Sequence, residues 1–313
     1  MIVVISHPDD RHAAAVSTAL GRVGEEVVLF DLADLPDRAT LGVDYDDPCD
    51  PVVTLVHDGV TSVLSDATAV WWRRPQAPVL DAIGDVDVLG FTHGEWYEAL
   101  NGIYQLLDCP WLNDPIRNEV ASRKALQLKV AAELGLRIPR TLMTSDADAA
   151  LRFVEREGLG NVIYKSFAST HQVWRETRKL RADDLAMFDS LKLAPVIFQE
   201  HIPAAADVRV TIVGDQVFPL EIDARRSDYD VDFRVDMGHA ATRAATIPDE
   251  VEKRLRRMME RFGLAYGAVD LRRTPDGDYV FLEINPAGEF LFAEVHGQFP
   301  ITDAVAGWLR SPG

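Results

Sequence analysis

Short apolar runs alternate with helix-like spacing at the start of the chain. Residues 2–5 form an apolar run that predicts a strand, and a helix that Asp9 or Asp10 would cap follows it and stops at Gly24. A second apolar run over 27–30 predicts the next strand. This strand–helix–strand order is typical of an open α/β sheet.

The same patterns predict elements for the rest of the chain. The stretch 31–65 is acidic, and we expect it to be irregular apart from the apolar segment VVTLV. Further strands are predicted at 69–72, 138–144, 161–165 and 196–199, and helices at 95–107, 118–134, 146–157, 180–192, 248–262 and 302–309.

Two hairpin patterns occupy the C-terminal third. Residues 207–224 read as two alternating strands joined at Gly214-Asp215, which is a strong hairpin signal. The second pattern pairs GAVDL at 267–271 with YVFLEI at 279–284 through the turn TPDG at 274–277. Both patterns predict antiparallel strands.

Glu283 is the one charged residue in the apolar run 279–284. A carboxylate inside an apolar run is costly to bury unless a cation or a strong donor meets it. Asn285 lies two residues further on and so shares its face, and the hairpin brings Asp270 to the same patch. Three oxygen donors of this kind suit Mg²⁺ with phosphate oxygens. The alternative is that Glu283 is an edge-strand carboxylate that faces water.

Composition and charge narrow the classes of protein. The chain has 313 residues, 47% hydrophobic and 26% charged, so two or three modules fit. A formal charge of −18 argues against general nucleic-acid binding. No apolar run is long enough to span a membrane and no signal peptide is evident, so we expect a cytoplasmic protein. Cys49 and Cys109 are expected to be reduced.

Several cations stand at positions that suit an anionic ligand. The motif WWRRP places Arg73 and Arg74 at a predicted strand end, where they form either a solvated rim or an anion site. Lys124 falls on a predicted helix, and Lys165 closes an apolar strand. A lysine at a strand end is well suited to phosphate.

The turn SHPDD after the first strand resembles the metal-binding turn of the zinc N-acetylglucosaminyl deacetylases. Arg11 replaces the glutamate that this family has next, and no paired-histidine motif follows. A helix N-cap explains Asp9 and Asp10 without metal chemistry.

The order of motifs in the remaining chain resembles the ATP-grasp superfamily over residues 111–313. It runs from the Lys124 helix through Lys165, the QEHIP strand and the DVR hairpin to GAVDL and LEINP. WWRRP, WLNDP, EINPAGEF and ITDAVAGWL look like the microviridin-type ribosomal peptide maturases, or graspetide macrocyclases. Glu289 departs from that pattern, where an uncharged glutamine is expected, and the loop after Lys165 is short of glycine.

The resemblance implies an α/β fold that is α+β in its ATP-grasp core. An N-terminal pre-ATP-grasp domain would span 1–110, a central ATP-grasp subdomain 111–192 and a C-terminal subdomain 193–313.

The resemblance also implies roles for individual residues. ATP would be bound by Lys124, Lys165, Gln199, Glu200, His201, Ile202 and Asp207, the last through ribose. Asp270, Glu283 and Asn285 would hold Mg²⁺, with two ions expected. Arg209, Arg234 and Lys165 would act at the transferring phosphoryl group, and Arg73, Arg74 and Arg225 would bind substrate. Asp232 and His201 are the two options for a base at the acceptor.

The activity that the resemblance implies is ATP-dependent ligation within a ribosomal precursor peptide. The peptide would carry a leader and an acidic, Thr/Ser-rich core, and its Asp or Glu side chains would be activated as acyl phosphates. Attack by Thr or Ser hydroxyls or Lys amines would give macrocyclic esters or amides, and the enzyme is expected to be a homodimer. Two alternatives stay open: a ligase of the ribosomal-protein-S6-modifying type that adds an amino acid, and a nucleotide-binding sensor without catalysis.

Overall fold

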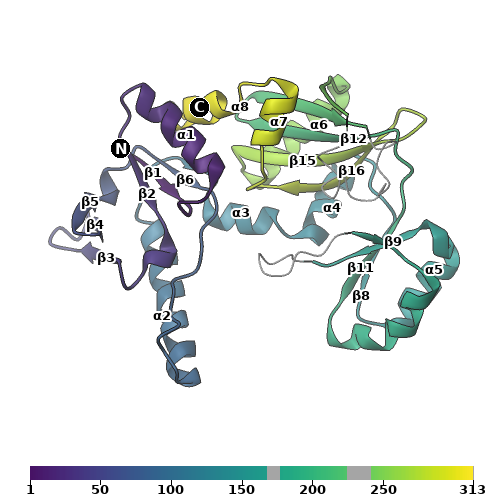
Figure 1. The fold of residues 1–313 in the computed structure, drawn as a ribbon, viewed down its shortest axis with the longest axis horizontal. Coiled ribbons are helices and arrows are strands. Elements are labelled where there is room, and N and C mark those ends of the chain that lie inside the picture. The colour runs from purple at the N-terminus through teal and green to yellow at the C-terminus, as the bar shows by residue number, and fades with distance from the viewer. Residues whose placement is uncertain (168–176, 224–240, 313) are drawn as a thin grey trace.

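The computed structural model describes residues 1–167, 177–223 and 241–312 (Figure 1). Within these residues the chain forms three sheets of four or five strands and one smaller sheet. None of the described helices combines the length and the apolar character that are needed to cross a membrane.

The N-terminal sheet has the strand order β2-β1-β6-β7, with all pairs parallel. Its strands are β1 (Ile2–Ile5), β2 (Val27–Phe30), β6 (Ala69–Trp72) and β7 (Trp111–Leu112). Helix α1 (Arg11–Arg22) crosses between the first two strands, and the Asp10 side chain caps it by accepting from the backbone N–H of His12. The predicted strand–helix–strand start is confirmed.

The expectation of irregular structure over 31–65 was wrong. This stretch contains a three-stranded antiparallel sheet of β3 (Ala39–Asp44), β4 (Val52–His57) and β5 (Val60–Val63). Asp58 and Gly59 both have positive φ angles, of 47° and 80°, as a tight Asp-Gly hairpin turn requires. The high acidic content masked an alternating pattern whose apolar positions, such as Val53 and Leu55, are fully buried.

The helices before the central sheet differ from their predicted bounds. Helix α2 (Val86–Tyr104) begins nine residues before its predicted start at 95. The single helix predicted over 118–134 is two helices, α3 (Pro115–Ala121) and α4 (Lys124–Glu133). Asp114 and Pro115 start α3 by side-chain capping and a fixed φ angle.

The central sheet has the order β10-β9-β11-β8 and forms a separate lobe at the lower right of Figure 1. Its elements are β8 (Thr141–Thr144), α5 (Ala147–Glu157), β9 (Val162–Lys165), β10 (Arg178–Lys179) and β11 (Val196–Glu200). The helix predicted over 180–192 is a 3₁₀ helix over Ala182–Leu193, and shorter 3₁₀ turns cover Leu32–Asp34, Leu64–Asp66 and Leu159–Asn161.

The largest sheet is antiparallel, with the order β14-β13-β12-β15-β16. Its strands are β12 (Ala206–Val213), β13 (Gln216–Ile222), β14 (Thr242–Ala244), β15 (Tyr266–Arg273) and β16 (Tyr279–Asn285). Both predicted hairpins are confirmed, as β12–β13 and β15–β16. Three helices complete this part of the chain: α6 (Asp249–Phe262), α7 (Leu291–Gly297) and α8 (Ile301–Arg310).

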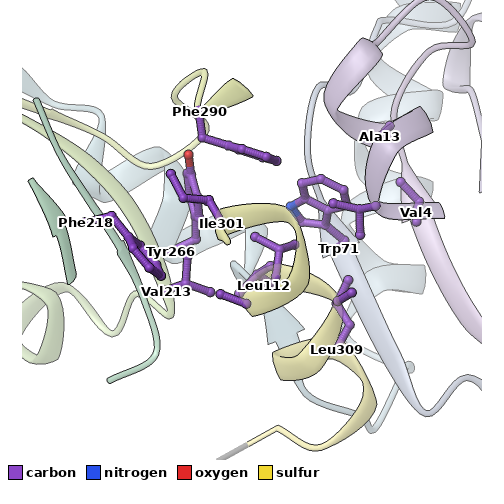
Figure 2. Packing of buried hydrophobic residues seen from close by; sticks show 14 of the residues in the cluster. Val4, Ala13, Trp71, Leu112, Val213, Phe218, Tyr266, Phe290, Ile301 and Leu309 are labelled. Atoms are coloured by element: carbon purple, nitrogen blue, oxygen red, sulfur yellow. The ribbon is translucent and has the colours of Figure 1, made fainter. Parts of the chain in front are cut away.

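The two faces of the large sheet pack against different partners. One face, with Val210, Val269 and Phe281, packs on α4 and α6. Part of the other face shares a hydrophobic core with the N-terminal sheet, α7 and α8. Figure 2 shows Trp71 of β6 and Leu112 of β7 within this core, together with Tyr266, Phe290 and residues of α8. The N-terminal module and the large sheet are therefore joined by a continuous core rather than by a linker.

Candidate active site

A row of charged side chains crosses the large sheet. In the strand register Arg209 of β12 lies opposite Asp270 of β15, and Asp270 lies opposite Glu283 of β16. Arg209 Nε is 3.2 Å from Asp270 Oδ1, and the guanidinium also lies over the ring of Phe292 from α7, 5.6 Å from its centroid. Directly opposed residues share a face of the sheet, so the hairpin brings these groups together as predicted.

Lys124 extends the row from outside the sheet. It is the first residue of α4, and its Nζ lies 2.5 Å from Glu283 Oε2. The side chains of Lys124 and Glu283 are 24% and 18% exposed, whereas those of Arg209 and Asp270 are 7% and 9% exposed. The row therefore runs from the interior of the protein to a solvent-accessible end, with charges in the order plus, minus, minus, plus.

Gln127, which the sequence patterns did not single out, fixes α4 against the edge of this sheet. Its side-chain amide donates to the carbonyl of Ile284 at 2.8 Å and accepts from the N–H of Ile284 at 3.2 Å. The amide thus satisfies the unpaired edge of β16 as a neighbouring strand would. This contact holds Lys124 beside Glu283, and a lone glutamine in a helix gives no sequence signal for it.

Asn285 completes the predicted oxygen-donor set. It lies opposite Ala268 and two residues beyond Glu283, on the same face as Glu283 and Asp270. Two carboxylates and an amide oxygen are hard donors, and Asn285 is exposed, so this set fits Mg²⁺ in the presence of phosphate oxygens. Across the described residues, no group of three or more His, Cys, Asp or Glu side chains could hold a metal ion by itself, so this set depends on the Asn285 amide and on phosphate oxygens.

Asp207 has a well-defined partner inside the protein. Its two carboxylate oxygens lie 2.7 and 3.0 Å from Nε and Nη2 of Arg272, directly opposite on β15, and both side chains are almost fully buried. Arg272 also donates to the carbonyl of Ile202. This buried bidentate pair gives Asp207 a structural role, and ribose binding by Asp207 stays a prediction.

The predicted adenine segment lies along β11 in the central lobe. Gln199 is buried and donates to Thr141 Oγ1 at 2.9 Å, and Glu200 contacts Arg140. The N–H of His201 donates to the carbonyl of Asn161 at 2.7 Å. Lys165, at the end of β9, pairs in register with Ile197 of β11. These residues share one sheet, and their contacts with ATP stay predictions.

Arg73, to which the resemblance gives a role in substrate binding, is buried in the protein, and that role stays a prediction. Arg73 is 1% exposed, and its Nε lies 3.1 Å from Asp10 Oδ2. Its Nη1 donates to the carbonyls of Ala287 and Gly288 at 2.5 and 3.0 Å. The guanidinium is thus enclosed by the protein at the junction between the N-terminal sheet and the turn after β16.

Arg74 is more accessible than Arg73. Its side chain is 28% exposed and pairs with Glu289 at 2.9 Å, beside a cavity of about 550 Å³. Burial raises the pKa of Glu289, but the charge of Arg74 and its hydrogen bond outweigh burial and lower it overall. The departure from the family pattern at Glu289 is therefore matched by a local cation, and substrate binding by Arg74 stays a prediction.

The SHPDD turn is built as a helix cap. Asp10 accepts from Ser6 Oγ, from the N–H of His12 and from Arg73. Burial opposes ionisation of Asp10, but these contacts outweigh it and lower the pKa. Burial, followed by the charge of Arg73, lowers the pKa of His12 to about 4. These contacts explain the turn without zinc.

Four residues singled out from the sequence lie outside the described residues. They are Arg225, Asp232 and Arg234, with the neighbouring Arg226, together with most of the basic loop that follows Lys165. The roles predicted for the first three in substrate binding, acceptor activation and phosphoryl transfer stay predictions.

Two family models match successive parts of the chain. The model of the MvdD pre-ATP grasp domain matches residues 1–119, and that of the RimK-like ATP-grasp domain matches residues 121–296. The two models meet near residue 120, and the expected boundaries at 110 and 192 stay predictions. Among curated proteins, none matches the chain by sequence.

Three solved structures are similar to the chain over nearly their whole length. The macrocyclase MdnC from Microcystis aeruginosa MRC, bound with precursor peptide MdnA, is 29% identical, with a TM-score of 0.87 and coverage of 99% of this chain and 98% of that one. A RiPP-associated ATP-grasp ligase from Chryseobacterium gregarium, in complex with ADP and a leader and core peptide, is 26% identical, with a TM-score of 0.88 and coverage of 100% and 97%.

The ATP-grasp ligase PsnB, complexed with minimal precursor, Mg and ADP, is 30% identical, with a TM-score of 0.81 and coverage of 99% and 96%. The chain therefore belongs to the RimK-like ATP-grasp family and carries the MvdD pre-ATP-grasp domain of the ribosomal-peptide macrocyclases.

Proposed function

We propose that the chain is an ATP-dependent carboxylate ligase that links side chains of a ribosomally made precursor peptide into macrocycles. One observation carries the proposal: the Arg209–Asp270–Glu283 row, closed by Lys124, lies on an ATP-grasp sheet of the kind found in precursor-peptide ligases. The similarity extends over both the ATP-grasp part and the N-terminal module, so it is not limited to nucleotide binding.

ATP and Mg²⁺ fit the groups on the sheet. Asp270, Glu283 and Asn285 would hold Mg²⁺, and the ammonium groups of Lys124 and Lys165 would meet phosphate oxygens. Because Lys124 now pairs with Glu283, a metal ion at that carboxylate would leave the ammonium available to a phosphate. Support for the metal also comes from PsnB, which was solved with Mg and ADP. We propose that two Mg²⁺ ions bind.

The charges suggest how the chain would promote the first step. A peptide carboxylate attacks the γ-phosphorus of ATP, so an O–P bond forms, the bond to the ADP oxygen breaks, and an acyl phosphate results. Both reactants are anions, and Arg209, Lys124 and Lys165 would reduce their repulsion and hold them in line. Bound Mg²⁺ would supply further neutralisation of phosphate charge.

In the second step a hydroxyl or amine of the same peptide attacks the acyl carbon. The new C–O or C–N bond forms, the bond to phosphate breaks, and the acceptor loses a proton, so each link removes one water from the peptide. Holding donor and acceptor on one chain makes this step intramolecular, which lowers its entropic cost. We propose an acidic, Thr/Ser-rich core as donor and acceptor, with esters as well as amides as products.

Mass spectrometry of a candidate substrate tests the proposal. The purified protein is incubated with ATP, Mg²⁺ and the short acidic, Thr-rich peptide encoded beside its gene. We expect a mass loss of one water per link, and no loss with Glu283→Gln. A mass gain would instead identify an amino-acid-adding ligase, and ATP turnover with an unchanged peptide would contradict the proposal.

We also propose a homodimer that uses α2 and the adjoining surface of α3. Of the 19 residues in α2, only Leu100 and Tyr104 are buried, whereas Val86, Phe91 and Tyr97 are at least 63% exposed. Figure 1 shows α2 extending away from the rest of the molecule. A cavity of about 1010 Å³ lies between α2 and α3 and is lined mainly by apolar and aromatic residues. Isolated helices of this length are marginal in water, which favours a permanent partner.

A further inference from the structure

The turn that follows β16 is held by side chains from the N-terminal module. It comprises residues 286–290 and comes directly after Asn285, one of the three proposed Mg²⁺ ligands. The motifs WWRRP, WLNDP and NPAGEF, which lie far apart in the sequence, meet at this turn through Arg73, Asn113 and the turn backbone. The three motifs therefore occur together in the sequence because their residues contact one another in the fold.

Arg73 makes the strongest of these contacts. Its Nη1 donates to the carbonyls of Ala287 and Gly288, while Asp10 accepts from its Nε and balances its charge. Hydrogen bonds from a buried guanidinium are stronger than those between neutral groups. A single side chain, directly after the end of β6, thus fixes two consecutive carbonyls of the turn.

Asn113 and Tyr266 hold the same turn from its other side. Asn113 Nδ2 donates to the carbonyls of Pro286 and Tyr266 at 3.0 and 2.8 Å, and its Oδ1 accepts from the N–H groups of Ala265 and Tyr266. The hydroxyl of Tyr266 donates to the carbonyl of Gly288 at 2.8 Å. Asn113 is 1% exposed, so water does not compete for these bonds.

The backbone of this turn fixes the position of Asn285. The N–H of Ala287 donates to Asn285 Oδ1 at 3.0 Å, and the N–H of Gly288 donates to the carbonyl of Asn285 at 3.2 Å. A Cβ atom at Gly288 would lie 2.4 Å from the Cβ of Ala268, the residue opposite Asn285 on β15. The close approach leaves little freedom, so a displacement of the turn would rotate the Asn285 amide.

We propose that Arg73 is a positioning residue for the metal site, with Asn113 and Tyr266 in support. Arg73 acts through the carbonyls of Ala287 and Gly288 to hold the oxygen of Asn285 towards the Mg²⁺ that would also bind Asp270 and Glu283. The inference rests on the proposed use of Mg²⁺ at these residues. It assigns the N-terminal module a part in nucleotide binding by the C-terminal sheet.

Binding of ADP at varied Mg²⁺ concentration, measured by calorimetry without any peptide, tests this role. Groups that orient metal ligands typically contribute about 10–100-fold to metal affinity. We expect Arg73→Met to raise the Mg²⁺ concentration for half-saturation at least about tenfold, and Arg73→Lys to recover part of that loss. ADP binding in the absence of Mg²⁺ should change less than about twofold, since a positioning role acts through the metal.

Arg310→Met is the matched control. The Arg310–Glu25 pair also joins the C-terminal part to the N-terminal module, but its contact is between two side chains outside the turn. We expect this variant to keep the wild-type Mg²⁺ dependence. Tyr266→Phe removes one hydrogen bond to Gly288 while preserving the ring, and it should raise the Mg²⁺ requirement by a smaller factor even if Arg73→Met does not fold.

A double-variant cycle separates positioning from general stabilisation. If Arg73 acts through Asn285, Arg73→Met should add little to the loss already caused by Asn285→Ala. Fully additive losses, or wild-type Mg²⁺ dependence in folded Arg73→Met and in Tyr266→Phe, would overturn the inference. Failure to cross-link a peptide would leave it standing, because the assay contains none. Absence of any Mg²⁺ effect on ADP binding by the wild type would overturn both this inference and the proposed metal site.

Discussion

Glu283 lies where the charged row reaches solvent. Its carboxylate pairs with Lys124 across the edge of the sheet, whereas Asp270 pairs with the buried Arg209. The partly exposed pair can exchange partners at lower cost than the interior pair, because it keeps some contact with water. The structure thus separates a carboxylate at a solvent-accessible position from one that an arginine holds in the interior.

Replacing Glu283 by glutamine removes that exchange. We expect Glu283→Gln to lower ATP-dependent turnover at least about 100-fold, with little change in the melting temperature, because the pair is partly exposed. Steady-state assays of phosphate release and thermal unfolding measure the two effects.

Glu221→Gln is the matched control. Glu221 lies on β13 of the same sheet and pairs with Arg243 and Arg273, outside the row. Its replacement should leave turnover within about twofold of the wild type. An equal loss in the two variants would show that the effect comes from the sheet's general charge and not from Glu283.

Asp207 gives a prediction about stability. Removing one partner of a buried ion pair leaves the other charge uncompensated, so we expect Asp207→Asn to lower the free energy of unfolding by about 3–5 kcal/mol. Glu25→Gln, which breaks an exposed pair with Arg310, should cost no more than about 1 kcal/mol. Urea unfolding compares the two. A stable Asp207→Asn with a raised KM for ATP would instead support ribose binding.

The element that most constrains the site is the hairpin β15–β16. Its register sets Asp270 against Glu283 and Ala268 against Asn285, and the turn at its end is clamped by residues of the N-terminal module. His12 belongs to this junction: its Nδ1 accepts from the N–H of Phe290 at 3.4 Å, and its ring packs edge-on against Phe290. The junction is therefore sensitive to the charge of His12.

The pKa of His12 predicts a pH dependence of stability. The folded-state pKa of about 4 lies below the ordinary value of 6.5, so the unfolded chain binds more protons between these pH values. The contribution is complete above pH 6.5 and is lost as the pH falls towards 4, up to about 3 kcal/mol. The charged groups near His12 are Arg73, Asp10, Glu289 and Arg74.

Unfolding by urea between pH 7 and pH 4.5 measures this effect. In His12→Asn, which keeps an acceptor that does not titrate, the slope of stability against pH should be smaller over that range. An unchanged slope would show that other groups govern the acid sensitivity.

How far the sequence predicts the site depends on how local each contact is. The hairpin could be predicted because the TPDG turn and the strand period are encoded within 20 consecutive residues. Its full register could not: regular pairing from that turn would set Asp270 opposite Leu282, and a shift in register between Asp270 and Leu271 sets Asp270 opposite Glu283 instead. The burial of Arg73 could not be predicted, because an arginine pair at a strand end looks the same whether it meets a ligand or the protein. Its partners Asp10 and Ala287 are 63 and 214 residues away, and no local pattern indicates them.

The predicted bounds of some helices and strands were also wrong for physical reasons. The helix over 118–134 was predicted as one from the helical spacing of Leu126, Val130 and Leu134. All three follow the break, because α3 ends at Ala121 and α4 begins at Lys124. This break places Lys124 at a helix start beside Glu283. The β3–β5 sheet was missed because acidic residues crowd the connection between β3 and β4, from Asp44 to Asp50, and the turn at Asp58, which gave the stretch the composition of a loop.

At the scale of the whole molecule, one core unites the N-terminal module with the large sheet, while the central lobe has its own core. Trp71, Leu112, Tyr266 and Phe290 belong to the shared core (Figure 2), and Phe153, Phe188 and Phe198 belong to that of the central lobe. Separate cores permit relative motion, so we expect the central lobe to move against a rigid remainder when nucleotide binds.

The exposed face of α2 gives a prediction about assembly. Charged residues introduced at Phe91 or Tyr97 would have to be buried without partners in the proposed dimer. We expect Phe91→Asp and Tyr97→Asp to convert the dimer to a monomer at micromolar concentration in sedimentation velocity experiments. Val23→Asp, at an exposed apolar residue after α1, is the control and should remain dimeric. A monomeric wild type would refute the proposed assembly.

The central claim is that ATP activates a carboxylate of a peptide that this chain then cross-links. The most direct measurement uses the neighbouring acidic peptide with its side-chain carboxylates labelled by a heavy oxygen isotope, and it follows both the peptide mass and the label in released phosphate. The account predicts that each link removes one labelled oxygen from the peptide and that this oxygen appears in phosphate. Cross-linked peptide with unlabelled phosphate, or labelled peptide recovered unchanged after ATP is consumed, would contradict it.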